Sequence, residues 1–336
     1  MPDRPAPSPE PAPGAPSCRE AFQALREAVA ATVVGQRALL ERLLVAVLAD
    51  GHLLVEGVPG LAKTTAVRAL AEALGLGFRR IQFTPDMIPG DVTGSEILQP
   101  EEGRFRFVPG PVFHELVLAD EINRAPPKVQ SALLEAMEER QVTVAGRTRA
   151  LPEPFLVMAT QNPLEQEGTY PLPEAQLDRF LMKVELDYPS QEEELEILRR
   201  HTRSWRGEAP PPRPAPRPGA EGVLAARREV AGVYLDAMLE RYIVALVHAT
   251  RDPGPWDPEA ARWVERGASP RACLALARAA RARAWLEGRD YVEPDDLLAL
   301  APDVLRHRLR LGLAAQAEGV TPRQAVARLL EAVPVP

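Results

Sequence analysis

A lysine and two threonines close a glycine-bearing segment that follows an apolar run at residues 53–55. The segment reads Gly57-Val58-Pro59-Gly60-Leu61-Ala62-Lys63-Thr64-Thr65, and a helical pattern continues to residue 74. Backbone N–H groups in such a loop, and at the start of the helix after it, bind phosphate oxygens. Lys63 would reach the β- and γ-phosphates, and the Thr64 hydroxyl would hold Mg²⁺. The pattern predicts a nucleotide site, since a plain strand-to-helix turn leaves Lys63 without a purpose.

The residue before the lysine departs from the usual pattern of phosphate loops, which have glycine there. This chain has Ala62. An alanine Cβ disfavours positive φ angles. We therefore expect Ala62 to adopt a helical conformation.

Two acids end the apolar run at residues 116–119, namely Asp120 and Glu121. An apolar run without alternation is typical of a central parallel strand buried on both faces. Ligands bind at the carboxyl ends of such strands in open α/β sheets. Asp120 would hold the Mg²⁺ shell and Glu121 would polarise the attacking water. The alternative is a pair of solvated acids at a strand end.

Further polar residues could belong to the same site. Asn162 follows the apolar run 155–159 and would bind a γ-phosphate or the water, although asparagine is also a common turn residue. Gly35 and Gln36 interrupt a helical pattern; they could line an adenine pocket or simply break the helix.

A serine and a proline at 269–270 predict the start of a helix, with Ser269 as its N-cap and Pro270 as its first residue. This places Arg271 in the first turn. A cation is electrostatically disfavoured at a helix N-terminus. Arg271 therefore indicates an anionic partner, and a solvated surface arginine is the alternative.

The order of elements predicts two domains behind a tail. Residues 1–17 are rich in proline and alanine, which favours disorder. Residues 18–203 alternate helices and strands, with two hairpin insertions near 97–108 and 141–149. A proline-rich linker or loop is expected over 204–228, and a helical lid domain over 229–336.

The composition excludes several classes of protein. The chain has 336 residues, 46% of them hydrophobic and 26% charged, and a net charge of −7. That charge argues against a general nucleic-acid binder. No apolar run reaches the roughly 20 residues of a membrane span. The two cysteines give no disulfide framework, which fits a reducing cytoplasm.

Taken together, these motifs resemble those of an AAA+ ATPase of the MoxR family, in the helix-2-insert clade. The resemblance covers roughly residues 34–332. It is carried by the segments 57–64, 120–124 (Asp-Glu-Ile-Asn-Arg), 159–163 (Ala-Thr-Gln-Asn-Pro), 170–180 (Tyr-Pro-Leu-Pro-Glu-Ala-Gln-Leu-Asp-Arg-Phe) and 267–271 (Gly-Ala-Ser-Pro-Arg). It implies a P-loop α/β domain with a parallel sheet flanked by helices, and a small all-α lid.

The resemblance also implies roles for individual residues. Walker A would end at Lys63-Thr64, Walker B would be Asp120-Glu121, sensor 1 would be Asn162, the arginine finger Arg179 and sensor 2 Arg271. ATP and Mg²⁺ would be the ligands, and the two hairpins would be the helix-2 and pre-sensor-1 insertions. Relatives form hexamers and act as chaperone-like partners of von Willebrand factor A domain proteins.

Three functions are compatible with these motifs. The first is an ATP-driven chaperone that remodels or matures partner proteins. The second is the motor subunit of a chelatase-type metal insertase, which shares most of the motifs. The third is a nucleotide-gated scaffold without hydrolysis, against which the intact Glu121 and Arg179 argue.

Overall fold

The computed structural model describes residues 17–58, 60–100, 103–163, 168–208 and 217–336. The predicted tail at 1–16, Pro59 of the phosphate loop and the proline-rich stretch 209–216 lie outside these ranges. Ser17, the last residue of the predicted tail, is described. Its hydroxyl accepts a hydrogen bond from the Glu20 N–H and caps the first helix.

A five-stranded parallel sheet lies at the centre of the α/β region, in the order β2-β5-β8-β1-β9. Its strands are β1 (Leu53–Glu56), β2 (Phe78–Gln82), β5 (Leu116–Asp120), β8 (Leu156–Gln161) and β9 (Met182–Glu185). The apolar runs predicted as central strands are β5 and β8, which lie next to each other. Their carboxyl ends carry Asp120, Glu121 and Asn162, so these residues meet at one edge of the sheet.

Helices cover both faces of the sheet, and alternate strand residues contribute to two separate cores. Leu53 and Val55 pack into one core, whereas Leu54 packs into the other. The first core includes helices α1 (Cys18–Thr32), α2 (Arg37–Leu48) and α3 (Lys63–Leu74); the second includes α5 (Pro127–Glu139). The predicted α/β fold with a parallel sheet is confirmed.

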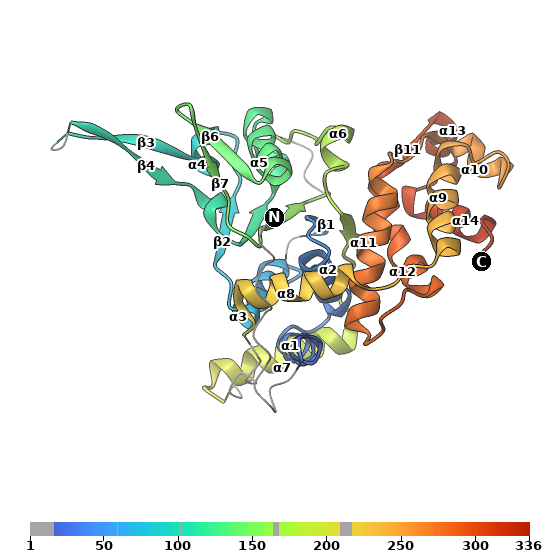
Figure 1. The fold of residues 1–336 in the computed structure, drawn as a ribbon, viewed down its shortest axis with the longest axis horizontal. Coiled ribbons are helices and arrows are strands. Elements are labelled where there is room, and N and C mark those ends of the chain that lie inside the picture. Colours follow the sequence, from blue (N-terminus) through green and yellow to red (C-terminus); the bar gives the residue numbers. More distant parts are fainter. Residues whose placement is uncertain (1–16, 59, 101–102, 164–167, 209–216) are drawn as a thin grey trace, which may run out of the picture.

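Two hairpins project from the α/β region at the upper left of Figure 1. One pairs β3 (Gly94–Gln99) with β4 (Arg104–Pro109), and the other pairs β6 (Gln141–Val144) with β7 (Arg147–Ala150). The Arg149 guanidinium lies 3.9 Å from the centre of the Phe107 ring, which joins the two hairpins. Short elements α4 (Pro89–Thr93), η1 (Pro111–Phe113) and η2 (Ile122–Arg124) connect the strands around them.

Two helices occupy parts of the range 204–228, which was expected to be a linker or loop. Helix α7 (Gln191–Trp205) enters this range, and α8 (Gly219–Ala231) occupies its second half. Val223, Ala226 and Val230 lie three or four residues apart and are buried against the first core. The sequence did not predict α8, because the proline-rich stretch before it is typical of extended chain.

The C-terminal region is helical, as predicted. It contains the following elements: α9 (Ala237–Arg251), α10 (Pro258–Trp263), β10 (Val264–Arg266), α11 (Arg271–Leu286), α12 (Pro294–Leu305), η3 (Arg306–Arg308), β11 (Arg310–Leu311), α13 (Leu313–Glu318) and α14 (Pro322–Ala332). Within the described ranges, no helix combines the length and apolar character that a bilayer crossing requires.

The start of α11 differs from the prediction. The helix begins at Arg271 with Pro270 as its N-cap, one residue later than expected. The Ser269 hydroxyl donates to Asp178 Oδ2 at 2.7 Å and accepts from the Arg271 N–H at 3.2 Å. Ser269 thus still satisfies one N–H of the first turn, but it also ties the lid to the segment after α6 (Glu174–Leu177).

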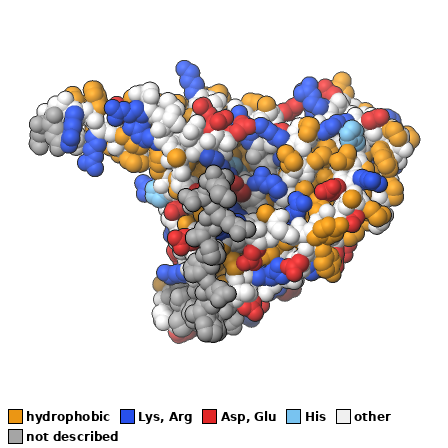
Figure 2. Space-filling model, viewed as in Figure 1, with side chains coloured by type: hydrophobic (Ala, Val, Ile, Leu, Met, Phe, Trp, Pro, Cys, Tyr) orange, Lys and Arg blue, Asp and Glu red, His pale blue; other side chains and the backbone are white. Residues whose placement is uncertain are grey.

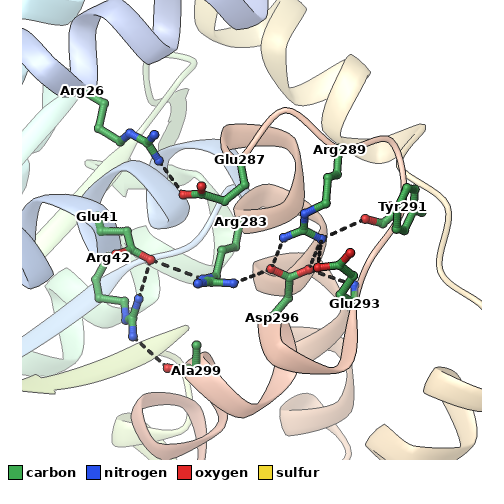
Figure 3. A network of polar contacts seen from close by, with 10 residues as sticks. All are labelled: Arg26, Glu41, Arg42, Arg283, Glu287, Arg289, Tyr291, Glu293, Asp296 and Ala299. Atoms are coloured by element: carbon green, nitrogen blue, oxygen red, sulfur yellow. Dashed lines mark hydrogen bonds and ion pairs between the residues drawn. The ribbon is translucent and has the colours of Figure 1, made fainter. Parts of the chain in front are cut away.

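The lid shares its apolar core with the helices that cover the first face of the sheet, because α1, α2, α8, α11 and α12 contribute to one cluster. A chain of polar contacts crosses the same boundary (Figure 3). Arg26 pairs with Glu287 at 2.6 Å, Arg42 donates to the Ala299 carbonyl at 2.7 Å, and Arg283 bridges Glu41 and Asp296. The lid is therefore fixed to α1 and α2 of its own chain by burial and by charge.

Candidate active site

The phosphate loop turns directly into α3, whose first residue is Lys63. Ala62 has φ 55° and ψ 21°, so the helical conformation expected for it is wrong: the residue is left-handed. Gly60 also has positive φ, at 89°. Left-handed residues in a tight loop turn successive N–H groups towards one concavity, which suits an anion. The Cβ of Ala62 makes this conformation cost about 1–2 kcal/mol.

Lys63 is half-buried, and its ammonium group donates to the Gly57 carbonyl at 2.6 Å. Burial lowers the pKa of Lys63, whereas the carboxylates of Asp120 and Glu121 raise it and oppose that effect. The cation therefore lies between the loop and the two acids, where the charge of bound phosphates would be located.

Asp120 is held from two sides at the end of β5. The Thr160 hydroxyl donates to its Oδ1 at 2.6 Å, and Arg80 donates to its Oδ2 at 2.9 Å and 2.7 Å. These contacts fix the orientation of the carboxylate. Thr160 lies on β8 and Arg80 on β2, so both neighbouring strands contribute.

Glu121 has a left-handed backbone, with φ 59° and ψ 50°. Such a conformation is rare for a residue with a long side chain and is concentrated at functional sites. The Glu121 N–H donates to the Thr160 hydroxyl at 2.9 Å. Its carboxylate accepts from Gln82 at 2.8 Å and from Arg124 at 3.3 Å. These bonds hold the carboxylate in place at the end of β5.

These side chains line one pocket of about 350 Å³ at the carboxyl edge of the sheet. Its described lining residues are Gly60, Leu61, Ala62, Lys63, Thr64, Thr65, Arg80, Asp120, Glu121 and Asn162. Six of the ten belong to the predicted phosphate loop, and two are the predicted acids Asp120 and Glu121. Asn162 is the predicted sensor 1. Gly57 and Val58 connect β1 to the pocket and are not among its lining residues.

The residues fit Mg²⁺ and a nucleotide. Thr64 and Asp120 offer the oxygen ligands that Mg²⁺ prefers, and the loop N–H groups with Lys63 suit phosphates. Gly35 and Gln36 are not among the described lining residues. Gln36 is buried at the N-cap of α2, and Gly35 lies against Pro189 and Glu193. The adenine role of Gly35 and Gln36 stays a prediction.

Arg179 and Arg271 lie elsewhere, in a second pocket of about 310 Å³. Its lining includes Gly51 and His52, which precede β1, and Phe180 and Leu181, which precede β9. This pocket is therefore at the amino edge of the sheet, whereas the phosphate loop is at the carboxyl edge. From His52 to Gly57 a strand spans about 16 Å, at about 3.3 Å per residue.

Several residues that line the two pockets, or that hydrogen-bond the residues lining them, were not predicted. Arg80 and Gln82 are two residues apart on β2, so both side chains face the same side, and this spacing was a signal in the sequence. Thr160 was visible at the end of the apolar run of β8. Glu138, which contacts both Arg179 and Arg271, gave no such signal, because its partners are 41 and 133 positions away.

Comparisons with known proteins agree with this geometry. The family model described as "ATPase family associated with various cellular activities (AAA)" matches residues 52–182, and that of the AAA lid domain matches residues 259–329. The crystal structure of a candidate ATPase from Cytophaga hutchinsonii superposes with a TM-score of 0.87 at 46% identity, covering 95% of this chain and 96% of that one.

Among curated proteins, Chaperone MoxR1 of Mycobacterium tuberculosis is 48% identical over 90% of this chain and 79% of its own length. Protein MoxR of Methylorubrum extorquens is 38% identical over 87% of this chain and 88% of its own. The chain belongs to the MoxR family of AAA+ ATPases. In this MoxR-family chain the AAA match covers the sheet from β1 to the start of β9, and the lid match begins inside α10.

Proposed function

We propose that this chain hydrolyses ATP in a ring, most simply a hexamer, whose active sites are each shared by two neighbouring copies. Hydrolysis would drive the remodelling or maturation of a partner protein. The supporting observation is the division of the site: the phosphate loop and both acids lie at one edge of the sheet, and both arginines lie at the other.

The division supports a role for both arginines in the site of a neighbouring copy. Arg179 and Arg271 point to the same residue, Glu138, and the length of β1 separates them from Lys63. An arginine side chain is shorter than this separation. We therefore infer that neither guanidinium reaches a phosphate bound at Lys63 of its own chain. A neighbouring copy could bring both to that phosphate at once, so we assign both arginines to the reaction in trans.

Phosphoryl transfer depends on positioning and charge stabilisation. Each residue of the shared site would have a separate role in it. Lys63 and the loop N–H groups would bind the phosphates, and Thr64 and Asp120 would hold Mg²⁺. When bound, Mg²⁺ neutralises phosphate charge. Glu121, oriented by Gln82, would accept a hydrogen bond from the attacking water, and Asn162 would help to place that water. Arg179 and Arg271 of the next copy would stabilise the charge on the γ-phosphoryl group.

Glu121→Gln tests the role of the water-orienting acid. The amide keeps the shape of the side chain and loses the carboxylate, so turnover should fall by roughly 10²–10⁴-fold. ATP affinity should stay near that of the parent, because Lys63 is untouched. Glu135→Gln, an exposed acid of α5, is the control and should hydrolyse ATP normally. Parent turnover in Glu121→Gln, together with loss of turnover in Asp120→Asn, would show that the base lies elsewhere.

The two hairpins are the surface that we assign to the partner protein. Phe105 at the end of the β3–β4 hairpin is 66% exposed, and Ile97 and Leu98 are about half exposed. The space between the hairpins, about 390 Å³, is lined by Arg104, Arg106, Arg147 and Arg149 among others. Basic and hydrophobic side chains share this projecting arm at the left of Figure 2. Exposed apolar groups beside cations suit an acidic protein segment with apolar residues.

Removing the end of this surface should separate partner binding from hydrolysis. Deleting residues 104–108 should leave ATP turnover within about twofold and abolish capture of partner proteins. Phe107 packs on Phe113 at a ring distance of 5.6 Å, so the milder variant Phe105→Ala with Arg147→Ala is made in parallel. Leu198→Ala, at an exposed leucine of α7, is the control. Loss of ATPase activity in the milder variant would show that the hairpins belong to the catalytic fold.

The identity of the partner is proposed from the family resemblance alone. It favours a protein with a von Willebrand factor A domain, acting with this chain in the cytoplasm. Co-purification with the Glu121→Gln variant and ATP, which holds the chain in one nucleotide state, is the direct measurement.

A further inference from the structure

Glu138 contacts both arginines of the amino edge. Its Oε2 lies 2.8 Å from a guanidinium nitrogen of Arg179, and its Oε1 accepts from Arg271. Each arginine therefore takes one oxygen of a single carboxylate. Arg179 follows α6, Arg271 begins α11 and Glu138 lies in the last turn of α5, so this carboxylate joins three separate elements.

The C-terminus of α5 and the N-terminus of α11 each carry a charge that the helix dipole disfavours. Glu138 is an acid at a C-terminus, where no basic residue lies in the last turn, and Arg271 is a base at an N-terminus. Glu138 and Arg271 therefore each need a counter-charge from outside their own helix. The ion pair between them supplies that counter-charge to both. Without Glu138, Arg179 and Arg271 would be two like charges near the positive end of α11.

The position of Glu138 is fixed by the core beneath it. The buried His52 ring accepts from the Val157 N–H at 3.0 Å and donates to the carbonyl of Met137, the residue before Glu138, at 3.1 Å. Burial first, and the neighbouring Arg140 second, lower the pKa of His52 to about 3, so the ring stays neutral and keeps both bonds at neutral pH. The end of α5 is thereby tied to β1 and β8.

We propose that Glu138 is a positioning residue that holds Arg179 and Arg271 together as one unit directed at the γ-phosphate of the neighbouring copy. This rests on the shared-site function proposed above. Both ion pairs are partly exposed, with side-chain exposures of 30–47%. Pairs of this kind are weak, so a phosphate can displace the carboxylate. Glu138 sets the geometry of the arginines before the neighbour arrives and does not block them.

Glu138→Ala should slow hydrolysis and leave nucleotide binding intact. The misplaced arginines should reduce kcat by roughly ten- to a hundredfold, with ATP affinity by calorimetry unchanged. Alanine favours helix, so α5 should persist. Glu139→Ala is the matched control, because it removes the same charge one residue along α5 and leaves both ion pairs in place. A kcat equal to the parent's, or above it, would overturn the inference.

Chemical modification tests the contact without hydrolysis. Phenylglyoxal adds to a guanidinium that has lost its proton, and a paired carboxylate holds that proton. Modification of Arg179 and of Arg271, followed by peptide mass spectrometry, should be several-fold faster in Glu138→Ala than in the parent and in Glu139→Ala. Arg266, which pairs with Glu174, is the internal standard. Equal rates in all three proteins would show that Glu138 does not hold these arginines.

Mixing Glu138→Ala with other defective variants locates the defect. Glu138→Ala should regain activity with Lys63→Ala, which supplies an intact arginine face, and should not regain it with Arg179→Ala. Recovery with Arg179→Ala would place the defect at the phosphate loop and overturn the inference. Parent activity in Arg179→Ala would defeat the shared-site function itself. Parent activity in Glu138→Ala alone would defeat only the role of Glu138.

Discussion

Lys63→Ala is expected to weaken ATP binding by at least about a hundredfold, since charged hydrogen bonds contribute about 1.5–3 kcal/mol each. Lys63 is the cation closest in sequence to the loop and reaches back to the Gly57 carbonyl. Arg80, another cation of the pocket, is committed to Asp120, so it is not placed to substitute. Without Lys63, the phosphates would face Asp120 and Glu121 with less positive charge between them.

Isothermal calorimetry measures this effect directly. Lys128→Ala, which removes an exposed lysine of α5, is the control and should bind ATP like the parent. A melting curve of each variant without nucleotide shows whether the fold is kept. An unchanged ATP affinity in a folded Lys63→Ala protein would refute the assignment of the phosphate loop.

Arg179→Ala should bind ATP normally and hydrolyse it very slowly. Arginine fingers supplied by a neighbour are typically worth ~10³–10⁵ in rate. Arg179 lines the pocket at the amino edge and is not among the described residues that line the phosphate pocket, so ATP affinity of the isolated chain should not depend on it. Arg266→Ala, at an exposed arginine paired with Glu174, is the control with parent turnover. Loss of ATP affinity in Arg179→Ala would place this arginine within its own nucleotide site.

The parts of the site that directly follow apolar runs in the sequence were predictable. The apolar runs of β5 and β8 end in Asp120, Glu121 and Asn162, and parallel pairing of those strands brings the three together. The family resemblance added Arg179 and Arg271 as a pair of functional arginines. Their common position at the other edge of the sheet required the three-dimensional structure.

Three predictions from the sequence were wrong or incomplete, each for a different reason. Ala62 is left-handed, although propensity disfavours that conformation, because the turn into α3 demands it. Ser269 bonds Asp178 of the segment after α6, which shifts the start of α11 to Arg271. Helix α8 was missed because its apolar spacing follows a proline-rich stretch. A tertiary contact explains the Ser269 case, the geometry of the loop explains Ala62, and the composition of the preceding stretch explains why α8 was missed.

The central claim is that one active site is built from two copies of the chain, and a mixing experiment tests it most directly. Lys63→Ala keeps an intact arginine face, and Arg179→Ala keeps an intact phosphate loop. Each variant alone should be inactive. Mixed in equal amounts, they should form some interfaces that contain both intact parts, and partial ATPase activity should return. If mixed assemblies form, as shown by differently tagged chains that co-purify, and activity does not return, the shared site is contradicted. Arg124, which pairs with Glu121 in the same chain, would then be the next candidate.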